Sequence, residues 1–280
     1  MPRLLFRPRR FFKARSAYRP ALLLPILLLC LALALSACGG GGSSSGGSSA
    51  SLTHIKGSSA TITKPMLNHW MGALVGEDFH ASVGSRAPGG LVAEPADYGA
   101  CLEAAKTVVP RSPSGKLKLS DAQIEAKCRE LHEALKAQAI AFLLSVQWTV
   151  QEGEEQGLHI SEAELHQYYK RYQKEVLGGS EASARKYLAE RHWSVADLLY
   201  MLKRSMLVSR ILPKFEAKVK RAGGGEKTYA RLALARYDGL IAKTSCEPGY
   251  VVLGCKEYRQ PAYAPPSAAV ILEGLAGGAG

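Results

Sequence analysis

The amino-acid sequence predicts a mostly α-helical protein: an extended helical unit with one long central helix, followed by a small C-terminal hairpin or loop that a disulfide bond closes. Three observations support this fold class. Apolar residues recur every three or four positions over most of the chain after residue 61, as in amphipathic helices. Three segments begin with a capping serine and a polar partner three residues later: Ser120–Gln123, Ser161–Glu164 and Ser194–Asp197. Farther along, Cys246 and Cys255 flank a turn and a short β-type run.

The longest helix is expected between Ser120 and Gly157. No helix-breaking residue occurs before Gly153, and Gly157 is a natural C-terminal stop. One face of this segment is apolar, and it carries Ile124, Cys128, Leu131, Leu135, Phe142, Val146 and Val150. At 1.5 Å per residue such a helix is about 50 Å long, and this length predicts an extended unit.

Shorter helices are expected on both sides of the long one, over residues 63–74, 98–109, 161–176, a short stretch from 180, 194–212 and 227–242. Pro213 is expected to kink or end the helix that begins at Ser194, because proline has no N–H to donate and its ring clashes with the preceding turn.

The first 37 residues have the organisation of an export signal. Seven Lys and Arg side chains and no acidic residue precede an uncharged apolar run, Ala21 to Ala37, which is shorter than the roughly 20 residues of a membrane-spanning helix. The run ends in Leu-Ser-Ala-Cys38, which resembles the lipobox of bacterial lipoproteins. This resemblance implies cleavage before Cys38 and acylation of its sulfur, with palmitate among the chains. It also implies a lipid anchor on the extracytoplasmic face of the cell membrane. The alternative is an ordinary cysteine in a retained N-terminal helix.

Five regions are expected along the chain. A Gly- and Ser-rich stretch after Cys38 has the composition of a flexible tether. The expected regions are a lipoprotein signal peptide (1–37), the tether (38–60), a helical domain (61–222), a returning helix with the cysteine-closed loop (223–260) and a disordered tail (261–280).

The net charge argues against a nucleic-acid partner. The formal charge of +12 includes seven of the 36 Lys and Arg residues in the signal region and none of the 24 Asp and Glu residues. Residues 38–280 therefore carry 29 basic against 24 acidic side chains, a net charge of +5. A balance this mild, together with export, is not typical of nucleic-acid binding.

Four cysteines remain beside Cys38, and they allow three disulfide pairings. The favoured pairs are Cys101–Cys128 and Cys246–Cys255, because each closes a local loop in an oxidising compartment. A zinc site is the competing interpretation, although the chain has no Cys-x-x-Cys motif and no histidine at ligand spacing beside these cysteines.

The middle of the chain is similar to the N-terminal chaperone domain of the SurA and PrsA extracytoplasmic foldases. The similarity covers about residues 60–220 and is carried by QWTVQEGEEQGLHISEAELHQY (147–168) and YLAERHWSVADLL (187–199). In that family a long helix ends in a Gly turn, and a capped helix, a short helix and a further apolar helix follow. The resemblance implies that the helices from Ser161 and Ser194 pack along the long helix. It also implies that the chain returns to the unit after Gly223–Gly225, and that the domain holds unfolded or exported polypeptides.

The resemblance gives no support for enzymatic activity. The residues after Pro213 contain no parvulin-like His…Leu opening, no Gly-Gly-x-Leu-Gly segment and no paired active-site histidines. No metalloprotease, Gly-x-Ser-x-Gly or phosphate-loop motif occurs either, so no catalytic residue, metal or cofactor is expected. The alternatives are an adaptor lipoprotein with one dedicated envelope partner and a degenerate peptidyl-prolyl isomerase.

Aromatic and Met residues at helical spacing are the candidates for binding client polypeptides, because Met adapts its shape to many partners. The same spacing is also typical of residues in a hydrophobic core. The candidates are Trp70, Trp148, Tyr168, Tyr172, Trp193, Met201 and Met206.

Overall fold

The structure is a computed structural model that describes residues 51–58, 61–83, 98–260 and 271. All of these belong to one compact unit, Gly47–Gly280. The expected signal region, Cys38 and the start of the tether lie outside the described residues. The expected tail also lies outside them apart from Ile271, whose side chain is buried in the main core.

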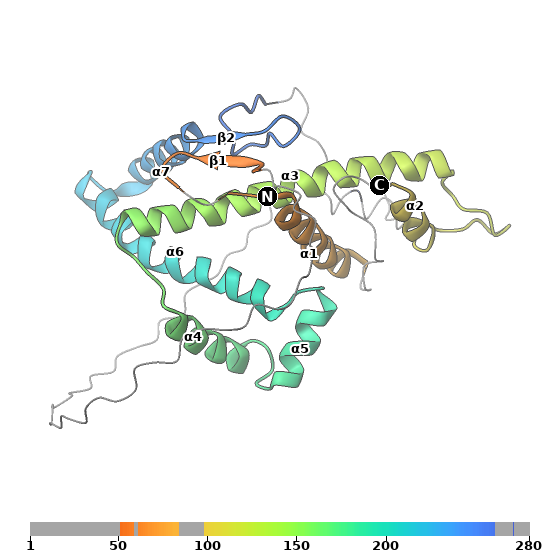
Figure 1. The fold of residues 1–280 in the computed structure, drawn as a ribbon, viewed down its shortest axis with the longest axis horizontal. Coiled ribbons are helices and arrows are strands. Elements are labelled where there is room, and N and C mark those ends of the chain that lie inside the picture. The colour runs from red at the N-terminus through yellow and green to blue at the C-terminus, as the bar shows by residue number, and fades with distance from the viewer. Residues whose placement is uncertain (1–50, 59–60, 84–97, 261–270, 272–280) are drawn as a thin grey trace, which may run out of the picture. The chain divides into compact units, whose positions relative to one another are not determined.

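The predicted fold class is confirmed, because the described residues form seven helices and two short strands (Figure 1). In chain order these elements are β1 (Thr53–Ile55), α1 (Lys64–Val83), α2 (Tyr98–Lys106), α3 (Asp121–Glu155), α4 (Glu162–Glu175), α5 (Glu181–Glu190), α6 (Val195–Arg221), α7 (Gly225–Ala242) and β2 (Thr244–Cys246).

The long helix α3 is the spine of the fold and contacts α1, α2 and α6. It begins at a capping box in which the Gln123 N–H donates to Ser120 Oγ, and the Ser120 N–H donates to Gln123 Oε1. It ends where Gly157 adopts a φ of 67°, a conformation that glycine adopts without steric cost. Its 35 residues correspond to a length of about 52 Å.

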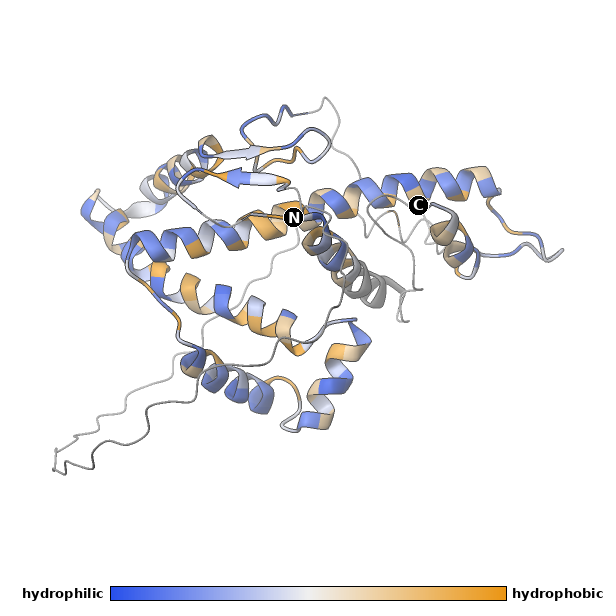
Figure 2. Ribbon diagram, in the orientation of Figure 1, coloured by the Kyte–Doolittle hydropathy of each residue, from blue (hydrophilic) through white to orange (hydrophobic). Residues whose placement is uncertain are grey.

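Buried apolar side chains form two clusters. The main core joins α1, α2 and α3 to the two strands and the loop after β2, and the second core lies among α4, α5 and α6. Trp193, two residues before α6, packs against both clusters. Figure 2 shows apolar and polar residues alternating along α3 and α6, the pattern of amphipathic helices.

Helix α4 packs against α6 and not, as the resemblance implied, along α3. Its buried residues Leu165 and Tyr169 belong to the second core, and Arg210 of α6 donates to Glu164 at a distance of 2.7 Å. The apolar face of α4 is therefore covered by α6.

Pro213 does not end α6, which continues to Arg221. Beyond the proline, Val219 is buried and Phe215 packs edge to face on Tyr229 of α7, with ring centroids 5.2 Å apart. This packing stabilises the last two turns, although the proline removes one backbone donor.

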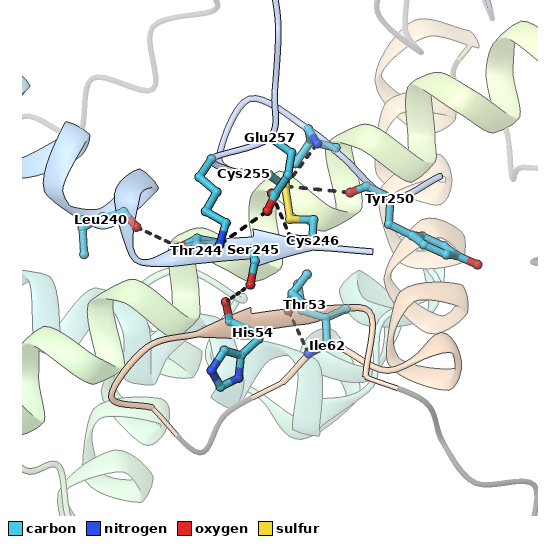
Figure 3. The surroundings of a disulfide bond; sticks show 12 residues. Thr53, His54, Ile62, Leu240, Thr244, Ser245, Cys246, Tyr250, Cys255 and Glu257 are labelled. Carbon is cyan, nitrogen blue, oxygen red and sulfur yellow. Dashed lines mark hydrogen bonds and ion pairs between the residues drawn. A yellow bond between two sulfur atoms is a disulfide. The ribbon is translucent and has the colours of Figure 1, made fainter. Parts of the chain in front are cut away.

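The two strands connect the beginning and the end of the described chain. They are antiparallel, with Thr53 opposite Cys246 and His54 opposite Ser245 (Figure 3). Leu52 and Ile55 are buried in the main core, so the folded domain begins before residue 52 and not after the expected tether boundary at residue 60. Thr53 and Ile55 form the buried face of β1, and Leu52 is buried just before them.

Candidate functional site

The candidate client-binding residues do not form one surface. Trp70 is 4 % exposed and packs against Phe142, with ring centroids 4.6 Å apart. Trp193 is half-buried, lies 6.3 Å from Trp70 and donates its indole N–H to the Ala73 carbonyl. Met201 packs against the same core. These side chains join α1, α3 and α6.

The remaining candidates belong to two other places. Trp148 is 8 % exposed and donates its indole N–H to Thr244 Oγ1 over 2.9 Å, which attaches β2 to α3. Tyr168, Tyr172 and Met206 are half-buried against the second core, where burial raises the pKa of the Tyr172 hydroxyl. Trp70 and Trp148 are therefore core residues, which is one of the two roles that their helical spacing allowed.

A hydrogen bond between a half-exposed histidine and a buried carboxylate supports the junction of α1 and α6. His69 Nε2 lies 2.5 Å from Asp197 Oδ1, and the Ser194 backbone N–H donates to Asp197 Oδ2 over 2.7 Å. Burial opposes ionisation of this carboxyl, but the hydrogen bonds from Ser194 and His69 hold its pKa below the ordinary value. The pair is a structural contact, because Asp197 also caps its own helix.

Both favoured disulfide pairs are confirmed. Cys101 and Cys128 have Cα atoms 6.0 Å apart and join α2 to α3, and those of Cys246 and Cys255 lie 5.8 Å apart. These four sulfurs are therefore not available as zinc ligands. Over the parts of the chain that the structure describes, no cluster of His, Cys, Asp and Glu could hold a metal ion.

The loop closed by Cys246–Cys255 is pressed against α3. The backbone N–H of Cys255 donates to the Val252 carbonyl over 2.8 Å, so these residues form a turn and not a β-type run. Gly254 touches Leu144 and Trp148 of α3, and a Cβ at this position would lie 2.8 Å from Leu144 Cδ1. The loop is therefore held at a fixed distance from the helix.

An open apolar groove of about 700 Å³ lies between this loop and α3. We call it the α3–loop groove. Among the described residues it is lined by Arg129, Glu130, Glu133, Ala134, Ala137, Ala141, Val251, Val252, Leu253 and Tyr258. Leu253 is 55 % exposed and Val251 is 36 % exposed, whereas Val252 between them points into the core.

The charged residues that line the groove form ion pairs within α3. Arg129 binds Glu125, Lys127 binds Glu130 and Lys136 binds Glu133, all along α3. Each charged side chain that lines the groove therefore has an oppositely charged partner, and most of the other lining residues are apolar.

Sequence reasoning missed this groove, although two signals for it were present. Ala134, Ala137 and Ala141 follow one helix face at spacings of three and four residues, which leaves a shallow channel. The run Val251 to Leu253 places two apolar side chains outward from a disulfide-closed loop.

Comparison with family models, with curated proteins and with solved structures finds no match to this chain. In the part of the chain that the structure describes, no helix combines the length and the apolarity needed to cross a membrane.

Proposed function

We propose that this protein is a lipid-anchored, extracytoplasmic chaperone-like lipoprotein of the SurA/PrsA type. It holds apolar segments of unfolded or exported polypeptides in the α3–loop groove. The observation that carries the proposal is this groove of about 700 Å³, in which Leu253 and Val251 are exposed. Concave apolar surface left open to solvent is typical of a binding site.

The chemistry of the groove suits a wide range of clients. Three of the six α3 residues that line it are alanines, whose small side chains accept differently shaped partners. Among the described residues that line the groove, none has a buried side-chain N or O atom without a hydrogen-bond partner, so binding depends on apolar area and not on sequence. Such contacts give weak and reversible affinity, which a holding chaperone needs.

Anchoring follows from the lipobox resemblance at Cys38. A single acyl chain holds a protein only marginally at a membrane, and a diacyl group makes the attachment stable. Cys38→Ala should therefore release the protein from membranes or leave it unprocessed. Lipid-anchored material that persists in this variant would contradict the assignment.

The holding activity is tested with residues 38–280 carrying Cys38→Ala, as the slowing of light scattering by an aggregating denatured protein. Leu253→Glu should weaken this activity about tenfold. About half of the Leu253 side chain is exposed and would be buried by a bound client, and the substitution removes this apolar surface and introduces a charge. Val176→Glu is the matched control, since Val176 is 54 % exposed and does not line the groove.

Three results would replace the proposal. Equal loss of activity in Leu253→Glu and Val176→Glu would separate the activity from the groove. One envelope protein bound at fixed stoichiometry, without any effect on aggregation, would indicate the adaptor. Catalysed cis/trans exchange of an X-Pro peptide would indicate the isomerase.

A further inference from the structure

Positive charge is concentrated in one hairpin of the structure. Residues 210–236, which we call the basic hairpin, comprise the end of α6, the Gly223–Gly225 turn and most of α7. They carry eight Lys and Arg residues against two Glu residues. The rest of residues 38–280 then carries 21 basic and 22 acidic residues, so the whole net positive charge of this chain segment lies in the hairpin.

Most of these cations have no carboxylate partner. Arg210 pairs with Glu164 and Arg236 pairs with Glu152. No acidic residue within the described ranges forms an ion pair with the other six cations, which are Lys214, Lys218, Lys220, Arg221, Lys227 and Arg231. The hairpin therefore presents an uncompensated positive surface to solvent.

Three of the six cations share one face of α6 and line a pocket of about 330 Å³. Lys214, Lys218 and Arg221 follow each other at spacings of four and three residues, and α7 contributes Arg236. Glu152, Gln156 and Phe215 complete the lining. The pocket lining thus has four cations and one carboxylate, and this excess of positive charge favours binding of an anion.

Gln156 adds a polar feature to this pocket. Its backbone carbonyl accepts a hydrogen bond from Lys214 Nζ over 3.3 Å, and its side-chain nitrogen donates to Glu152. Its side-chain oxygen is buried without a hydrogen-bond partner among the described residues. A phosphate ester would supply the negative charge that the cations of this pocket favour.

Exposed apolar side chains lie on the same hairpin. Leu234 is 61 % exposed, and Leu212 and Tyr229 are also exposed. Aliphatic side chains gain little from a nucleic-acid backbone, but they gain burial at the boundary between phospholipid headgroups and acyl chains. The combination of cations and exposed leucines is therefore the chemistry of a membrane surface.

We propose that the basic hairpin docks on an anionic phospholipid surface, with a headgroup phosphate in the pocket between α6, α7 and the end of α3. The inference rests on the export and lipid anchoring of the proposed function, because those would keep the domain next to a bilayer. The hairpin then orients the domain on the membrane to which Cys38 attaches it.

The test uses residues 38–280 with Cys38→Ala, so that no acyl chain contributes. Sedimentation with phosphatidylcholine vesicles, with or without an equal proportion of phosphatidylglycerol, should show binding to the anionic vesicles only. This binding should decrease with salt. Replacing Lys214, Lys218 and Arg221 by Gln should weaken it by roughly 100-fold, about fivefold for each cation.

The matched control removes three exposed cations elsewhere, Lys170, Arg171 and Lys174 of α4, and should leave vesicle binding within about threefold of the parent. Equal losses in the two triple variants would overturn the site. Far-UV circular dichroism and the unfolding midpoint verify that both variants are folded.

A separate variant distinguishes a lipid from other sources of phosphate. Leu234→Ser should weaken binding to anionic vesicles, because it removes an inserted side chain. Inorganic phosphate that abolishes vesicle binding at millimolar concentration, or DNA that binds as tightly as the vesicles, would overturn membrane docking. The hairpin variants should keep their aggregation-suppressing activity, and Leu253→Glu should keep vesicle binding, so the two proposals can fail separately.

Discussion

Gly254 lies where the disulfide-closed loop meets α3, and a methyl group at this position has no space. The added Cβ would be 2.8 Å from Leu144 Cδ1 and 2.9 Å from Trp148 Cη2, well inside the van der Waals separation of about 3.5–4.0 Å. Leu144 and Trp148 are both buried, and Cys246–Cys255 restricts movement of the loop. Gly254→Ala should therefore lower the free energy of unfolding by about 1–3 kcal/mol, the usual cost of overpacking.

Gly239→Ala is the matched control for this substitution. Gly239 lies inside α7, and an added Cβ would have no neighbour within 4 Å. The same chemical change should here raise the free energy of unfolding by about 0.5–1 kcal/mol, because alanine is a better helix former than glycine. Urea unfolding under oxidising conditions, followed by tryptophan fluorescence, should give shifts of opposite sign. A Gly254→Ala protein within about 0.5 kcal/mol of the parent would refute the argument that the loop is fixed against α3.

Three further predictions concern side chains that join distant parts of the chain. The pKa of Glu164 is lowered from 4.5 to about 2, first by the hydrogen bond from the Ser161 backbone N–H and then by the one from Arg210. The ionised carboxylate therefore stabilises the fold above pH 4.5, and this stabilisation is lost as the pH falls towards 2. Glu164→Gln should therefore lower the urea midpoint at neutral pH but not near pH 2, and an equal decrease at both would contradict this. Thr244→Val removes the hydroxyl that accepts the Trp148 indole N–H, and it should lower the free energy of unfolding in urea by about 1–3 kcal/mol. Thr244→Ser keeps the hydroxyl and should lower it by at most about 1 kcal/mol. Equal decreases in the two variants would exclude a role for the hydroxyl. Replacing Cys101 and Cys128 together by Ala should cost about 3–4 kcal/mol, because their disulfide closes a chain segment with a sequence separation of 27; a loss below about 1 kcal/mol would show that chain entropy is not the main term.

Features written into short stretches of sequence could be predicted. The capping serines at positions 120, 161 and 194 each lie one residue before a helix, since a cap needs only a side chain and a backbone N–H three residues later. Both disulfide pairs were predictable because each closes a local loop. The helical fold class followed from these local signals together with the apolar spacing.

Features that depend on distant residues could not be predicted. The pairing of β1 with β2 joins residues on either side of the whole helical unit, and no local pattern specifies a two-stranded partner so far away. The choice between core and surface for Trp70 and Trp148 depended on which helices would cover them. The groove combines alanines of α3 with a loop more than 100 positions later, so neither part indicates a site alone.

The basic hairpin shows a further limit of composition. A net charge of +5 over residues 38–280 suggests a mild and even surface. The average conceals a hairpin with eight basic and two acidic residues beside a remainder that is nearly neutral. The structure adds that α6 and α7 pack against each other, which brings cations of both helices to one pocket.

The distance along the chain between the paired strands sets an order of events during synthesis. His54 and Ser245 are neighbours in the sheet but lie 191 positions apart, which at roughly 5–20 residues per second corresponds to about 10–40 s of translation. If the chain leaves the cytoplasm during synthesis, β1 emerges early and lacks its strand partner through this interval, so its unpaired edge is exposed to other chains. A newly made copy of this protein would then be, for that time, a client of the kind that a mature copy is proposed to hold.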